Sequence, residues 1–298
     1  MSSIAYVTDE KMLEYHRLCR NRTILFWRLS SKKNFRDFKK GDILFFFAKP
    51  RYGRKKGLIG YAHYDSTKRM SLRQMWEKYG GCTGYDSEAL LREAVEKASR
   101  RDIPDKLNCL LLTNVVFFLS PIYPEEVGLK IPANLESYCY LDKNDPEITV
   151  RILQKAEMTG IDLWSSDENE DPAEIFRRDE LNHQFAMICK KIGAPDGSDR
   201  EKIQTRKLAA NKTQEPGWRY IRGSRTDCIY IENDTVRIAV PYVYQANDKE
   251  LRTRGLIGRI MMYTAYARRE KIRCTPVFEI MTQKDKEEAE NLLREIGI

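Results

Sequence analysis

What this chain lacks excludes several classes of protein. Its seven cysteines are scattered, odd in number and never spaced as Cys-x-x-Cys, which argues against a disulfide scaffold and fits a reducing cytoplasm. Only three histidines are present, which argues against a histidine-rich metal centre. No apolar run is long enough to cross a bilayer, and the first residues lack the apolar core of a signal peptide. We therefore expect a soluble, cytoplasmic protein without a membrane partner.

Two common catalytic motifs are missing as well. The glycines at Gly80-Gly81 and Gly223 lack the spacing and the lysine of a phosphate-binding P-loop. No serine lies in a nucleophile elbow, and no cysteine has a nearby histidine in the sequence that would single out a covalent mechanism. The sequence therefore indicates neither a nucleoside triphosphatase nor an enzyme with a covalent intermediate.

The length and charge of the chain indicate two domains and a polyanionic partner. Its 298 residues are enough for two cores of ordinary size, and its formal net charge of +8 favours anionic ligands. An acidic segment at 167–171, followed by Pro172, has the composition of a linker. We predict one domain at 1–165, a second at 166–298, and an α+β or α/β fold in both.

The most informative stretch of the first half is 38–64, in which two apolar runs flank a basic loop. The Lys-Gly-Asp sequence at 40–42 predicts a turn, and residues 43–47 and 58–64 predict a pair of strands. Positive charges around Tyr52 suit a phosphate backbone beside a stacked base. The alternative is a solvated hairpin tip whose lysines serve only solubility. The candidate phosphate-binding residues, one of them on a neighbouring strand, are Arg28, Lys49, Arg51, Arg54, Lys55 and Lys56.

Four segments of the first half carry a resemblance to a known superfamily. The segments 24–28, 38–47, 58–62 and 115–131 resemble the PUA-like superfamily, in particular its EVE, YTH and ASCH-like branches. The resemblance implies a mixed β-barrel with helices and a pocket for a nucleobase, often a modified one, taken from a single strand or flipped out of a duplex. The aromatic candidates for such a pocket are Trp27, Phe47, Tyr61, Trp76 and Tyr85.

Each of these aromatic residues also has an interpretation as a packing residue. Phe47 shares a strand face with Phe45, and at least one face of that strand is expected in the core. Trp76 has helical spacing from its apolar neighbours, which more often marks packing than a ligand cage. Trp27 and Tyr85 are favoured as ligand contacts, because residues in loops and at chain ends more often face a ligand.

The second half resembles another superfamily. Residues 223–270 resemble the core of the PD-(D/E)XK restriction-endonuclease superfamily, which implies a sheet domain of order αβββαβ. Asp227 lies where that family has its first metal ligand, and Glu180 lies on the preceding helix, where an additional carboxylate often occurs. The helix at 255–269 resembles the family's Gln-x-x-x-Tyr helix, with Arg259 in place of the glutamine.

Two residues that the nuclease chemistry requires are absent from this pattern. A glutamate on the second strand and a lysine two residues later help to hold a divalent cation and activate water. This chain has Ala239 and Pro241 in those positions. The domain is a catalytically inactive nuclease fold, or has an active site completed by residues at other positions, or has another fold. We favour the inactive nuclease fold, in which Asp227 is a turn residue and Glu180 lies on a solvated helix face. The candidates for migrated groups are Glu232, Lys249, Glu250 and Glu279.

Three functions remain open. The favoured one is a protein that binds nucleic acid, DNA rather than RNA, and recognises a base through its first domain. Its degenerate second domain then adds DNA contacts or forms a homodimer. The second is a modification-dependent endonuclease of a restriction or defence system, which would require Mg²⁺ or Mn²⁺. The third is a protein-binding assembly factor. Salt-dependent affinity for oligonucleotides separates the first two from the third.

Overall fold

The computed structural model describes residues 2–29, 35, 37–50, 53, 55–99, 104–132, 134–163, 171–232 and 235–283, with residues 287, 291 and 294 near the end. It divides into two compact units, Met1–Phe176 and Arg177–Ile298. The division falls within helix α5 (Pro172–Ile192). The boundary predicted at 165/166 and most of the closing helix predicted at 285–295 lie outside the described residues.

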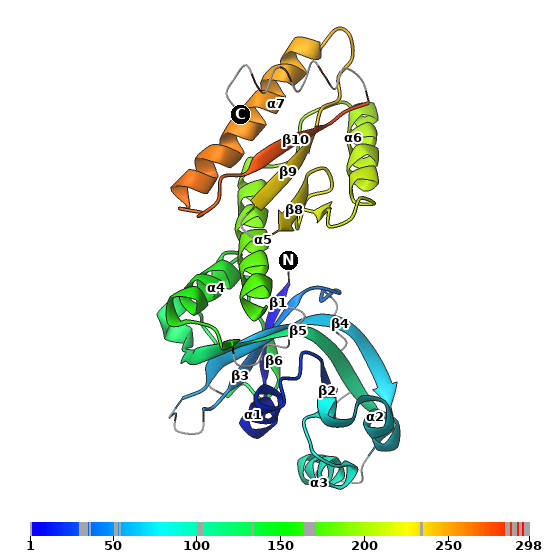
Figure 1. Ribbon diagram of the computed structural model, residues 1–298, viewed down its shortest axis with the longest axis vertical. Coiled ribbons are helices and arrows are strands. Elements are labelled where there is room, and N and C mark those ends of the chain that lie inside the picture. The colour runs from blue at the N-terminus through cyan, green and yellow to red at the C-terminus, as the bar shows by residue number, and fades with distance from the viewer. Residues whose placement is uncertain are drawn as a thin grey trace. The chain divides into compact units, whose positions relative to one another are not determined.

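Unit 1, Met1–Phe176, is built on a six-stranded sheet of order β2-β5-β4-β3-β1-β6 (Figure 1). Strands β1 and β3 run parallel, and the other neighbours run antiparallel. The strands are β1 (Ser3–Val7), β2 (Ile24–Arg28), β3 (Ile43–Ala48), β4 (Gly57–Met70), β5 (Leu107–Ile122) and β6 (Tyr138–Tyr140). The helices are α1 (Glu10–Leu18), α2 (Leu72–Tyr79), α3 (Glu88–Ala98) and α4 (Ile148–Thr159), with short 3-10 turns at Gly80–Thr83 and Pro124–Val127.

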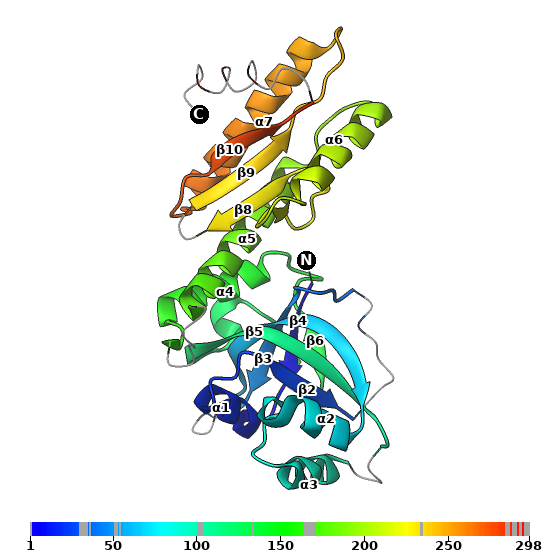
Figure 2. The ribbon, with the colours of Figure 1, turned by 45° about the vertical axis from the view of Figure 1, so that its right-hand side comes forward.

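The sheet of unit 1 is open among the described residues, so the predicted mixed β-barrel does not close. Among the described residues, β2 pairs only with β5 and β6 only with β1, which leaves two edges. Strands β4 and β5 are long and curve strongly across the unit (Figures 1 and 2). Their register shifts three times, between Leu58 and Gly60, Tyr61 and His63, and Tyr64 and Ser66. Because each bulge bends its strand, the sheet curls without closing.

Strand β3 is buried on both faces, because helices cover the sheet from two sides. All six of its residues are buried. Phe45 and Phe47 pack with Ile152 and other apolar residues of α4, whereas Phe46 packs on the opposite face with Leu13 of α1. The side-chain alternation of the strand therefore feeds two separate clusters.

The Lys-Gly-Asp sequence forms the turn that the sequence predicts. Gly41 has φ +83°, a left-handed conformation that suits glycine, and its amide donates to the Tyr64 carbonyl at 2.7 Å. The Asp42 carboxylate accepts from the Lys39 amide at 2.6 Å. The turn thus fixes the start of β3 beside β4.

His16 anchors α1 and makes unfolding of unit 1 sensitive to acid. It is fully buried, its Nδ1 accepts from Asn21 Nδ2 at 3.0 Å, and burial lowers its pKa from 6.5 to about 4. As pH falls below 6.5 the unfolded chain takes the proton first, so stability present at neutral pH is lost between 6.5 and about 4. From pH 7.5 to pH 5 we expect the wild type to lose about 2 kcal/mol more free energy of unfolding than His16→Gln. Urea titrations at the two pH values measure this difference, and equal losses would contradict it.

Unit 2, Arg177–Ile298, has a four-stranded sheet of order β10-β9-β8-β7 between helical layers (Figure 2). Its strands are β7 (Arg219–Tyr220), β8 (Cys228–Glu232), β9 (Thr235–Pro241) and β10 (Val277–Met281), and its helices besides α5 are α6 (Asp199–Lys212) and α7 (Lys249–Arg269). Phe185 of α5 and Ile260 of α7 pack against Ile238 and its neighbours, whereas Leu208 of α6 packs in a separate cluster with Ala239. The sequence of helix α6 is mostly polar.

Candidate functional site

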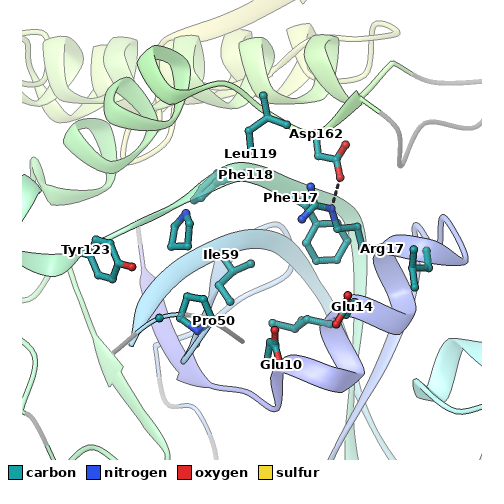
Figure 3. Close-up of a pocket in the computed structure, with 14 residues that line it drawn as sticks. Glu10, Glu14, Arg17, Pro50, Ile59, Phe117, Phe118, Leu119, Tyr123 and Asp162 are labelled. Atoms are coloured by element: carbon teal, nitrogen blue, oxygen red, sulfur yellow. Dashed lines mark hydrogen bonds and ion pairs between the residues drawn. The ribbon is translucent and has the colours of Figure 1, made fainter. Parts of the chain in front are cut away.

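A cavity of about 610 Å³ opens in unit 1 between α1, the loop from β3 to β4, and the last part of β5 (Figure 3). Its walls are largely apolar, and its polar groups lie mainly on α1 and at Asp162. Its apolar and aromatic lining residues include Ile59, Phe117, Phe118, Leu119, Pro50 and Tyr123. A cavity of this size and composition suits a small, flat, partly apolar ligand.

Helix α1 supplies the polar wall of this cavity. Glu10, Glu14 and Arg17 line the cavity, and their spacing of four and three residues puts them on one face of the helix. The side chains come from one direction, and the apolar wall of β5 faces them (Figure 3). The other side of the helix buries Met12 and His16, which keeps this face turned toward the cavity.

One ion pair lies among the lining residues of the cavity. Arg17 Nε donates to Asp162 Oδ2, and Asp162 is only 5% exposed (Figure 3). The Asp162 amide donates to the Phe117 carbonyl at 2.8 Å, which fixes the residue against β5. The cavity therefore has three carboxylates and one guanidinium among its lining residues, and it presents more hydrogen-bond acceptors than donors.

The basic loop forms the rim of this cavity through Pro50 and Gly53. Lys49 is exposed. Lys55 donates to Glu125 Oε1 at 2.7 Å, and this hydrogen bond raises the pKa of Lys55 and lowers that of Glu125. Lys56 Nζ donates to the Leu135 carbonyl at 3.0 Å. The two lysines thus tie the loop to 124–135.

Three other predicted phosphate contacts have different outcomes. Arg51 and Arg54 lie outside the described residues. Arg28 is 9% exposed, and its guanidinium carbon lies 4.9 Å from the centre of the Phe35 ring. Arg28, the last residue of β2, therefore packs beside Phe35 and does not line the rim of the cavity.

The five aromatic residues predicted to form one base pocket are divided between two clusters. Phe47 and Tyr61 are buried with α4, at 5% and 0% exposure, so neither has a face free for a ligand. Trp27, Trp76 and Tyr85 are partly buried around α2 and α3. Burial raises the pKa of Tyr85 to about 12. None of the five lines the cavity of Figure 3.

The residues that do line the cavity had no strong signal in the sequence. Glu10, Glu14 and Arg17 have the pattern of an ordinary solvated helix face. Asp162 is 145 residues from Arg17, and nothing local indicates that the two meet. The spacing of charges on α1 could have predicted a polar helix face, but it could not have predicted the apolar wall of β5 opposite that face.

In unit 2, Asp227 belongs to a buried network. Arg259 donates to Asp227 Oδ2 through Nε at 2.9 Å and through a terminal nitrogen at 2.6 Å, and Tyr263 donates to the same oxygen at 2.6 Å. Thr226 Oγ1 donates to the other oxygen at 3.0 Å. Asp227 and Tyr263 are fully buried, and Arg259 is 8% exposed. Burial alone would lower the pKa of Arg259, but the charge of Asp227 raises it.

The carboxylates proposed to rebuild a nuclease site also have partners elsewhere. Glu279 pairs with Lys212 and Arg237, Glu250 with Arg254, and Glu232 accepts from Tyr230. Glu180, expected on a solvated face, is 8% exposed and accepts from Gln184 at 3.1 Å. In the part of the chain that the structure describes, no group of three or more His, Cys, Asp or Glu residues could hold a metal ion. Ala239 and Pro241 are buried strand residues.

A second cavity, of about 520 Å³, lies in unit 2 between α6, the end of β9 and α7. Pro241 and Arg259 line it, whereas Asp227 does not. Two of the nuclease-like positions therefore line this cavity, but no carboxylate of the expected motif does.

Comparison with known proteins gave matches only among solved structures. No family model matches the sequence, and the search of curated proteins found no match. A mutant of the ASCH protein from Zymomonas mobilis is 17% identical, with a TM-score of 0.36, and the match covers 52% of this chain and 98% of that one. The ASCH protein itself is 16% identical, with a TM-score of 0.36 and coverage of 50% and 93%. These neighbours are ASCH domains, of the PUA-like superfamily, and they match about half of this chain.

None of the helices that the structure describes is long and apolar enough to cross a bilayer.

Proposed function

We propose that the chain binds nucleic acid and that unit 1 takes a single base into the cavity beside α1. The observation that carries this proposal is the division of charge around that cavity. Its lining has the carboxylates of Glu10, Glu14 and Asp162 and the guanidinium of Arg17, which pairs with Asp162, whereas the loop at its rim begins with exposed Lys49. The excess of negative charge in the lining repels phosphates and the rim attracts them, so the uncharged base is the part of a nucleotide that enters.

The interior groups favour a base that carries an exocyclic amino group. Carboxylates accept from the amino group of cytosine and, in the same way, from that of adenine, whereas thymine and uracil have no such donor. The apolar walls from β5 contact the base plane, and Tyr123 offers a ring at the edge. A modified base is included in the proposal, because the volume of about 610 Å³ leaves room around a heterocycle.

Unit 2 then has a supporting role, as a second nucleic-acid contact or a dimer interface. The Asp227 network favours this over catalysis, since both Asp227 oxygens are occupied by protein donors. The endonuclease alternative has one direct test, incubation with modified and unmodified DNA in Mg²⁺ or Mn²⁺. Specific cleavage would restore that alternative.

We expect Glu14→Ala to abolish the preference for amino-bearing bases and leave the salt-dependent part of binding unchanged. Fluorescence anisotropy with oligo-dC, oligo-dA and oligo-dT at two salt concentrations measures both. Wild type should bind dC or dA about tenfold more tightly than dT, because a good base-edge contact contributes about 1–3 kcal/mol. Ribo-oligonucleotides in the same assay decide between DNA and RNA.

The matched control is Glu96→Ala, which removes an exposed carboxylate from α3, away from the cavity. It should keep the base preference. If Glu14→Ala and Glu96→Ala behave alike, the cavity is not the base site. If no oligonucleotide binds in a salt-dependent manner, the assembly-factor alternative stands and nucleic-acid binding is wrong.

A further inference from the structure

Unit 2 contains a cluster of three arginines and a histidine that the proposed function does not use. Arg178 and His183 lie on α5, Arg219 lies on β7, and Arg222 follows that strand. Arg178 and Arg222 are close enough to Arg219 for their charges to act on it. Arg222 and His183 are joined directly, with Nη1 and Nε2 3.5 Å apart.

Arg219 is the least satisfied member of this cluster. Its Nε and one of its terminal nitrogens are buried and have no hydrogen-bond partner among the described residues. A buried donor without an acceptor is costly, and a buried charged donor more so. Burial lowers the pKa of Arg219, and the charge of Arg178 lowers it further. The charge of Asp179 raises the pKa of Arg219, whereas the charge of Arg222 lowers it.

The histidine of the cluster is an acceptor for Arg222. His183 Nδ1 lies 2.8 Å from the Asp179 carbonyl oxygen, which can only accept, so Nδ1 carries the proton. In the neutral ring Nε2 then has a lone pair, which faces Arg222. His183 thus orients the guanidinium of Arg222, and Asp179 is the acid whose charge acts on Arg219.

We propose that Arg178, Arg219 and Arg222 form a binding site for a phosphate group. A phosphate oxygen would accept from the two unpaired donors of Arg219 and would offset the repulsion among the three guanidinium groups. Planar guanidinium forks match phosphate oxygens in pairs, which favours phosphate over chloride. Arg178 and Arg222 are partly exposed, and long side chains of this kind change rotamer rapidly, which opens the donors of Arg219 to the anion.

The test uses the full chain and two probes, inorganic phosphate and a single-stranded oligonucleotide. Calorimetric titration with inorganic phosphate should show binding to wild type and at least tenfold weaker binding to Arg219→Gln and Arg222→Gln. Phosphate should also raise the Tm of wild type but not of these variants. Arg206→Gln, which removes an exposed arginine of α6, is the matched control and should bind as wild type does.

The outcomes separate the source of the phosphate. If Arg222→Gln also lowers the salt slope of oligonucleotide binding by about one, the site holds a backbone phosphate. If that slope is unchanged and inorganic phosphate still binds wild type, the site serves a small phosphorylated ligand. Lack of phosphate binding by wild type overturns the proposal. Arg219→Lys is a second variant in case Arg219→Gln does not fold. The proposal is also overturned if Arg222→Gln and a folded Arg219 variant both bind phosphate within twofold of wild type. Glu14→Ala should bind phosphate normally, so failure of the base cavity and failure of this site are distinct results.

Discussion

Replacing Asp227 by alanine is expected to lower the free energy of unfolding of unit 2 by about 3–5 kcal/mol. The substitution leaves the Arg259 guanidinium buried at 8% exposure without its counter-charge. It also removes the acceptor of the Tyr263 hydroxyl, which is fully buried. Arg259 keeps one bond, from Nη1 to the Gly193 carbonyl at 2.8 Å, and this neutral acceptor cannot replace a carboxylate. Urea unfolding followed by circular dichroism measures the loss.

A metal ligand would behave in the opposite way. If Asp227 served to hold a cation, its removal would leave stability without metal unchanged or raised, and Mg²⁺ or Mn²⁺ would stabilise wild type but not the variant. The buried ion pair predicts a large loss and no effect of metal. This single variant therefore distinguishes a structural carboxylate from a catalytic one, whatever the activity of the protein.

The double variant Asp227→Leu with Arg259→Met is the internal control. Removing both charges at once avoids the unpaired ion, and such replacements are often neutral or stabilising. We expect it to recover most of the loss of Asp227→Ala. Asp196→Ala, in the exposed loop before α6, should change stability by less than about 0.5 kcal/mol. A small effect of Asp227→Ala, similar to that of Asp196→Ala, would contradict the role given to this network.

The parts of the fold that were predictable from sequence have strong local patterns. The Lys-Gly-Asp turn and the aromatic run of β3 lie as predicted. Strand β6 is three residues long and only half buried, so it has no pattern of its own and pairs with β1 only in the folded chain. Helix α6 is mostly polar, and its buried face is narrow, which made its sequence resemble a loop.

The candidate site was less predictable, for a physical reason. Aromatic residues indicated a base pocket, but Phe47 and Tyr61 are large apolar side chains on central strands and are buried in the core. The cavity is lined by residues far apart in the chain, and their meeting depends on how β4 and β5 bend. Likewise, Arg259 was visible as a departure from the family pattern, but its pairing with Asp227 follows from the folded arrangement of α7 and β8.

Strands β4 and β5 approach each other so closely at Gly60 that a side chain has no room there, and Gly60→Ala is expected to lower the free energy of unfolding by about 3 kcal/mol. A Cβ at this position would meet the Val116 carbonyl oxygen and would lie 2.9 Å from the Phe117 Cα. Both contacts are backbone atoms of the neighbouring strand, so no side-chain rotation relieves them. The strands would have to separate at the point where Gly60 pairs with Phe117.

The same substitution should impair the cavity, because the two strands supply its walls. Ile59 precedes the glycine, and Phe117 and Phe118 line the cavity from β5. We therefore expect Gly60→Ala to weaken the base preference in any molecules that remain folded. Gly255→Ala is the control, since a Cβ there meets nothing within 4 Å, and in α7 it should stabilise by about 0.5–1 kcal/mol. Thermal unfolding of the two variants should give shifts of opposite sign. A Gly60→Ala protein as stable as wild type would show that the close approach of β4 to β5 does not limit this position.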